Sequence, residues 1–147
     1  MKKEDIKISG IKAGDGEPQN SGLQFFENRL QAGFPSPAQN EYADTIDLNR
    51  ALITNPAATF CARVIGNSMV DAGINEGDLL IIDRSIIPHD GNIAVCFVDG
   101  DFTVKRLSVR DEGVFLTPAN AKFPELKVDE ESDFKVWGVV SHIIKKV

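Results

Sequence analysis

The sequence predicts a mostly β fold, a twisted and partly closed β-sheet domain that follows a flexible N-terminal arm. From residue 59 onward, short apolar runs rich in Val, Ile and Phe alternate with segments containing Gly, Asp and Asn. Asp99-Gly100 lies between two such runs and is typical of a tight β-hairpin. In contrast, residues 10–22 are interrupted by Gly, Pro, Asn and Ser, which favour turns over regular structure.

Composition excludes several classes of protein. The 147 residues suffice for one domain with a hydrophobic core. Lys and Arg number 16 against 22 Asp and Glu, and the net charge of −6 argues against non-specific nucleic-acid binding as the main activity. No apolar run approaches the ~20 residues of a membrane span, and the charged N-terminus is unlike a secretory signal. We therefore expect a cytoplasmic protein without membrane attachment or sequence-specific DNA binding.

Cysteines and carboxylates give no sign of a metal or cofactor site. The two cysteines, Cys61 and Cys96, lie in apolar runs without metal-ligand spacing, and we expect small buried hydrophobic residues in a reducing compartment. Asp71, Asp78 and Asp83 are scattered over turns, where carboxylates usually cap or face solvent. We expect neither a metal nor a cofactor.

The first 40 residues contain little that predicts regular structure. Ile6–Ile8 is expected to be a short strand, and Leu23–Leu30 is the one locally helical segment, with Phe25, Phe26, Arg29 and Leu30 marking one face. Pro35 and Pro37 restrict the backbone of Gln31–Pro37 to an extended conformation. An extended peptide is what a protease active site binds.

The remainder is predicted to hold one helix and then strands. A helix is expected over Asp44–Thr54, ended by Asn55-Pro56. Strands are expected over Thr59–Ile65, Leu79–Asp83, Asn92–Val98, Phe102–Leu107, Val114–Thr117 and Val136–Ile144. Short strands at this spacing indicate a curved, partly closed sheet.

A serine and a lysine are the candidate catalytic residues. Ser68 follows Gly66 in a tight turn, but a serine hydroxyl needs a base to become a nucleophile. The two histidines, His89 and His142, form no Ser-His-Asp order with it. A lysine can act as the base when burial keeps it neutral. Lys105 fits, because it lies within an apolar strand.

Each of these residues also has a simple structural interpretation. A serine in a Gly-Asn-Ser turn is more often a turn former than a nucleophile. A lone lysine in a strand usually reaches solvent at an edge, and Ala32-Gly33 near two prolines is typical of a linker. The combination of a nucleophile, a base and an exposed small-residue peptide bond is more specific, and it predicts a protease that cleaves itself.

From Gly33 to the C-terminus the chain resembles the LexA/UmuD (S24) family of self-cleaving serine peptidases, and most closely its UmuD-like SOS mutagenesis proteins. The motifs that carry the resemblance are Gly33-Phe34-Pro35-Ser36-Pro37-Ala38, Ile46-Asp47-Leu48-Asn49, Gly66-Asn67-Ser68-Met69-Val70-Asp71-Ala72-Gly73-Ile74, Gly77-Asp78-Leu79-Leu80-Ile81-Ile82-Asp83, Val98-Asp99-Gly100-Asp101-Phe102-Thr103-Val104-Lys105-Arg106-Leu107 and Val136-Trp137-Gly138-Val139-Val140. They occur in order along roughly three quarters of the chain. The resemblance implies a mostly β peptidase domain of LexA/UmuD type.

The resemblance also implies a mechanism. Ser68 and Lys105 would form the catalytic dyad, and the N–H groups of Asn67 and Ser68 would form the oxyanion hole. The scissile bond would be Ala32–Gly33, which makes residues 1–32 a regulatory arm removed by self-cleavage. Residues 33–147 would then be the peptidase and dimerisation domain.

The resemblance further implies partners. Cleavage would be stimulated by the RecA filament on single-stranded DNA during the SOS response to DNA damage. The processed homodimer would serve a UmuC-like subunit, a Y-family DNA polymerase, in error-prone translesion synthesis. Two alternatives stay open: a regulator from a phage or mobile element of the same peptidase class that binds no DNA, and a dimeric interaction module that never cleaves.

Overall fold

The computed structural model describes residues 23–26 and 42–147. These residues fall into two units, one made of residues 23–26 and 42–54 and the other of residues 55–147. The predicted strand at Ile6–Ile8, the extended segment Gln31–Pro37 and the domain boundary after residue 32 lie outside the described residues.

The first unit begins with a strand where the sequence predicted a helix. Strand β1 (Leu23–Phe26) pairs antiparallel with β2 (Tyr42–Ile46), Leu23 opposite Ile46 and Phe26 opposite Tyr42. The helix predicted over Leu23–Leu30 is therefore wrong for its first half. Eight residues are too few for a helix to be stable by local propensity, and aromatic residues gain more in a paired strand.

The helix predicted over Asp44–Thr54 is also shorter than expected. Helix α1 covers Leu48–Leu52, because Asp47, the residue after β2, has an extended backbone and caps the helix. The Asp47 carboxylate accepts hydrogen bonds from the N–H groups of Asn49 (3.0 Å) and Arg50 (3.4 Å), which satisfies donors that the first turn leaves unpaired.

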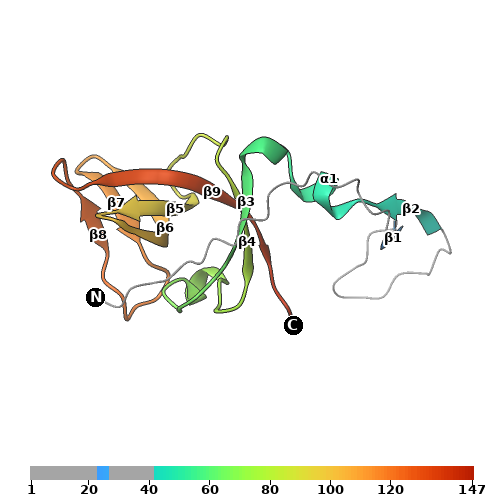
Figure 1. Cartoon of the computed structure of the whole chain (residues 1–147). Helices are drawn as coiled ribbons and strands as arrows, with labels where there is room; N and C mark the ends of the chain where they lie inside the picture. The colour runs from blue at the N-terminus through green and yellow to red at the C-terminus, as the bar shows by residue number, and fades with distance from the viewer. Residues whose placement is uncertain (1–22, 27–41) are drawn as a thin grey trace. The chain divides into compact units, whose positions relative to one another are not determined.

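The second unit is a seven-stranded antiparallel sheet with the order β3-β4-β9-β5-β6-β7-β8 (Figure 1). Its strands are β3 (Thr59–Arg63), β4 (Leu79–Asp83), β5 (Ile93–Val98), β6 (Asp101–Arg110), β7 (Gly113–Thr117), β8 (Leu126–Val128) and β9 (Phe134–Ile144). Two short 3₁₀ helices, η1 (Pro56–Ala58) and η2 (Val70–Ala72), flank β3 and its following loop. The prediction of a mostly β fold is confirmed.

The β5–β6 hairpin has the tight turn that the sequence predicted. Val98 pairs with Asp101, so Asp99 and Gly100 alone form the loop. Asp99 has a φ of 47° and Gly100 a φ of 92°, the left-handed values that a type I′ turn requires at both positions. The hairpin therefore fixes the register of β6, and with it the position of Lys105 opposite Ala94.

The last strand lies in the middle of the sheet. The long β9 ribbon in Figure 1 pairs with β5 along its first half, through Phe134–Val139, and with β4 along its second half, through Val139–Ile144. The first four strands of this unit thus form two antiparallel pairs, β3–β4 and β5–β6, which β9 joins.

Two clusters of buried apolar side chains hold the sheet. The larger cluster contains Ala62, Val64, Met69, Ile74, Leu80, Ile82, Val95 and Val104. The smaller one contains Ala94, Cys96, Leu107 and Leu116. Both cysteines are buried, as predicted. In the described ranges, 23–26 and 42–147, no helix has the length and apolar character needed to cross a membrane.

Candidate active site

Ser68 lies in a short loop between β3 and η2. Gly66 allows the loop to turn, because its φ of 94° is in the left-handed region that side chains disfavour. Met69, only 3% exposed, packs into the larger core cluster directly after the serine. Ser68 is itself 4% exposed, so the core fixes its position.

Lys105 approaches Ser68 from the centre of β6. Its Nζ lies 3.3 Å from Ser68 Oγ. The same nitrogen donates to Thr103 Oγ1 at 2.6 Å and to the carbonyl of Val104 at 3.2 Å. Lys105 is half-buried, and Leu107, two residues along the strand, is fully buried on the same face. The structure therefore brings the two predicted catalytic residues within hydrogen-bond distance of each other.

Thr103 is a further member of the site. Thr103 was not among the predicted site residues. Because residues two apart in a strand share a face, the Thr103 hydroxyl lies beside the Lys105 amine and holds it. A hydroxyl two positions before a strand lysine is the signal in the sequence that would have found this contact.

Cys96 does not compete with Ser68 as a nucleophile. It lies opposite Thr103 across the β5–β6 pair and is fully buried. Burial raises the pKa of the Cys96 thiol to about 12, although the nearby positive charge of Lys105 lowers it in part. The thiol therefore stays protonated at neutral pH, and the thiolate is the reactive form.

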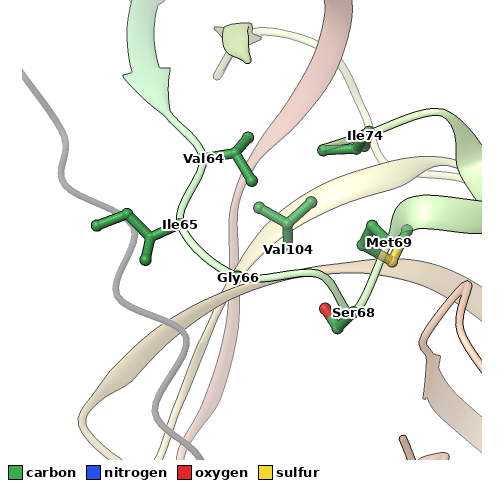
Figure 2. A pocket seen from close by; sticks show the side chains of 7 residues that line it. All are labelled: Val64, Ile65, Gly66, Ser68, Met69, Ile74 and Val104. Atoms are coloured by element: carbon green, nitrogen blue, oxygen red, sulfur yellow. The ribbon is translucent and has the colours of Figure 1, made fainter. Parts of the chain in front are cut away.

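A pocket opens next to the serine hydroxyl. Figure 2 shows the side chains that line it, with Val64, Val104, Ile74 and Met69 gathered on one side and Ile65 extending away from them; Gly66 and Ser68 complete the lining. Apart from the hydroxyl, every side chain in the lining is apolar. The pocket therefore suits a small apolar group held next to Ser68.

Two backbone N–H groups at the nucleophile donate no hydrogen bond to any residue in the range 42–147. Within residues 42–147, no carbonyl or side chain accepts a hydrogen bond from the N–H of Asn67 or of Ser68. These are the two groups predicted to form the oxyanion hole. Backbone donors next to a nucleophile can stabilise a developing oxyanion when a substrate is bound.

The loop that follows β7 braces the serine loop, a contact that no pattern in the sequence predicted. The Asp71 N–H donates to the carbonyl of Ala119 at 2.7 Å, and the Ala119 N–H contacts Met69 Sδ at 3.3 Å. The Asn120 side-chain amide donates to the carbonyl of Asn67 at 2.8 Å. Three contacts thus tie residues 67–71 to a segment about fifty residues away.

An ion pair between buried Asp78 and exposed Lys145 fixes the other end of the serine loop. Val64 exchanges backbone hydrogen bonds with the Gly77–Asp78 turn, and the Asp78 carboxylate accepts from the Asn75 N–H at 2.8 Å and from Lys145 Nζ at 2.5 Å. Burial raises the pKa of the Asp78 carboxyl, but these two partners outweigh burial and hold the pKa below its ordinary 3.8.

Neither histidine is part of this site, and the predicted cleavage site is not among the described residues. Ala32 and Gly33 are outside the described residues. His142 is exposed on β9 with its Nδ1 3.0 Å from Ser141 Oγ, and His89 is exposed in the loop before β5. Across residues 23–26 and 42–147, no three His, Cys, Asp or Glu side chains gather closely enough to hold a metal ion.

Comparison with known proteins places the chain among peptidases. The model of the Peptidase S24-like family matches residues 24–141. Protein SamA of Salmonella typhimurium is 40% identical over 136 residues, which cover 92% of this chain and 94% of SamA. Protein ImpA of Escherichia coli is 43% identical over 122 residues, 83% of each chain.

The chain is also similar to a repressor. The LexA repressor of Oleidesulfovibrio alaskensis is 31% identical over 144 residues, which cover 95% of this chain and 69% of the repressor. In the comparison with the S24-like family model, the matched residues include the serine loop, β6 and most of β9.

Proposed function

The chain belongs to the S24-like peptidase family, and from this premise we propose that it is a serine peptidase that cleaves its own Ala32–Gly33 bond with a Ser68–Lys105 dyad. The observation that carries the proposal is the 3.3 Å separation of Ser68 Oγ and Lys105 Nζ. This distance is within reach of a direct proton transfer between a nucleophile and its base.

The contacts of Lys105 support its role as the base. A neutral amine has two N–H groups and one lone pair. Thr103 Oγ1 and the Val104 carbonyl are acceptors, and they bind the two N–H groups. Ser68 Oγ lies 3.3 Å from the same nitrogen. In the proposed mechanism the lone pair of the neutral amine removes the proton of this hydroxyl.

The proposed reaction proceeds in two stages. Ser68 Oγ attacks the carbonyl carbon of Ala32 while its proton moves to Lys105 Nζ, and the carbonyl oxygen becomes an oxyanion stabilised by the N–H groups of Asn67 and Ser68. The C–N bond then breaks, and Lys105 returns the proton to the departing amine of Gly33. Water, deprotonated by Lys105, hydrolyses the resulting ester and regenerates the serine.

The pocket supports Ala32 as the residue before the scissile bond. Its lining by Val64, Met69, Ile74 and Val104 is apolar, and the methyl group of an alanine matches this environment. Glycine after the bond lets the backbone approach the serine closely.

The biological setting of the proposal follows the family resemblance. Cleavage is stimulated by the RecA filament on single-stranded DNA as part of the SOS response. The product, residues 33–147, acts as a homodimer and as the accessory subunit of a UmuC-like, Y-family polymerase in translesion synthesis. Similarity to proteins SamA and ImpA over most of their length supports this assignment.

Mass spectrometry of the purified chain tests the proposal. Incubation with an activated RecA filament, or at alkaline pH without it, is expected to give a fragment that begins at Gly33. Ser68→Ala is expected to leave the chain intact. Ser141→Ala is the matched control, because Ser141 is the serine that contacts a histidine, and it is expected to cleave normally. A Gly33 fragment from Ser68→Ala would refute the dyad.

A further inference from the structure

Asn120 lies in the loop after β7 and contacts the peptide unit that precedes the nucleophile. Its Nδ2 donates to the carbonyl oxygen of Asn67 at 2.8 Å. Its own Oδ1 accepts from the Lys122 N–H at 3.0 Å, which orients the amide so that Nδ2 faces Asn67. The side chain is half-buried, and the contact joins segments 53 residues apart in the sequence.

The geometry of a peptide unit gives this contact a consequence. The Asn67 carbonyl and the Ser68 N–H belong to one planar trans peptide, so they point in opposite directions. A hydrogen bond that holds the Asn67 carbonyl toward Asn120 therefore makes the Ser68 N–H point away from Asn120. That N–H has no acceptor among residues 42–147.

We propose that Asn120 is a positioning residue for self-cleavage: by holding the Asn67 carbonyl, it aims the Ser68 N–H at the site where the oxyanion forms. The inference rests on the proposed function, since it assumes that Ser68 attacks a peptide carbonyl. Asn120 touches neither Ser68 Oγ nor Lys105, so it acts on the oxyanion and not on the nucleophile or the base.

The backbone around this contact is otherwise well supported. The Asp71 N–H bond to Ala119 and the Ala119 N–H contact with Met69 hold the two loops together without the Asn120 side chain. Ala119 also packs against the larger core cluster. Loss of the Asn120 amide should therefore release one peptide unit while the loops stay in place.

Three variants of the full chain test whether the Asn120 amide affects cleavage through the Asn67 carbonyl. Asn120→Ala removes the donor and is expected to slow self-cleavage by roughly 10- to 100-fold, less than the roughly 10²- to 10³-fold loss when an oxyanion donor is deleted. Asn120→Asp keeps an acceptor for the Lys122 N–H but places an oxygen against the Asn67 carbonyl, and it should be at least as slow. Lys122→Ala, the control, keeps the backbone N–H that Asn120 binds and should cleave at the wild-type rate.

Two further measurements identify the step affected. The ratio of the cleavage rates at alkaline and neutral pH should be the same for Asn120→Ala and the wild type, because the base is untouched. The thermal midpoint of Asn120→Ala should stay within a few degrees of the wild type. Wild-type rates in Asn120→Ala or Asn120→Asp, a changed rate ratio, or a collapse of the thermal midpoint would each overturn this inference and leave the proposed function standing. If the wild-type chain fails to cleave, the proposed function fails, and this inference fails with it.

Discussion

Lys105 sets the expected pH dependence of self-cleavage. An ammonium donates to Ser68 Oγ at 3.3 Å and cannot accept its proton, so only the neutral amine is active. The first-order rate of self-cleavage without RecA should therefore be higher at alkaline than at neutral pH. Gel densitometry of the purified chain across a pH series measures this, and a rate independent of pH would contradict the role.

The variant Lys105→Arg keeps the positive charge and removes the ability to act as a base. A guanidinium does not lose its proton in proteins, so Lys105→Arg should cleave at least about 100-fold more slowly at every pH. An arginine variant with the wild-type rate would show that Lys105 only neutralises charge near the site.

The residue types predicted Ser68 and Lys105, but they could not predict contacts between segments that lie far apart in the sequence. Ser68 and Lys105 are recognisable because they occur together with an exposed small-residue peptide bond and because the surrounding motifs are long and in order. Their catalytic roles stay predictions. Asn120 gives no such signal: it is one of many Asn residues in turns, and only the return of the β7–β8 loop to the serine loop reveals its contact.

At the scale of elements, the pair Asp78–Lys145 links the residue after β9 to the turn before β4. Asp78 is 6% exposed, so loss of its partner leaves a buried carboxylate with less compensation. Lys145→Met should lower the free energy of unfolding at pH 7 by about 1 to 2 kcal/mol. Lys146→Met is the control, because Lys146 forms no ion pair within residues 42–147.

The pH dependence of that loss has a definite sign. The pKa of Asp78 is lower in the folded protein than its ordinary 3.8, so the pair contributes stability above that pH and loses it as pH falls through the folded value. The wild type and Lys145→Met should therefore converge in urea unfolding experiments at strongly acidic pH. A difference that persists unchanged under acid would point to packing of the lysine stem instead.

The sequence predicted the strands of the second unit better than the elements of the first. β4 over Leu79–Asp83 matches its prediction because a buried apolar run that contains two isoleucines and lies between turn residues favours a strand. β1 and α1 are short, and pairing with β2 and capping by Asp47 decide their conformations. β8 has three residues, too few for a periodic pattern.

At the scale of the whole molecule, self-cleavage should change what the protein binds. We predict that the full chain and a chain starting at Gly33 are both homodimers by light scattering. The shorter form should bind its cognate Y-family polymerase with a different affinity, because we expect the arm to compete with the polymerase for one surface of the domain. Equal affinities, or monomers at micromolar concentration, would argue against this role.

The central place of β9 also governs when during its synthesis the chain can acquire activity. Ser68 belongs to the β3–β4 hairpin and Lys105 to the β5–β6 hairpin, and in the sheet β9 lies between them. A ribosome makes β9 after both hairpins, and domains fold as the chain emerges. A nascent chain that still lacks Phe134–Ile144 therefore has both reactive side chains but no sheet to align them. The proposed self-cleavage would thus wait until β9 has joined the sheet, a safeguard that the strand order provides without any inhibitor.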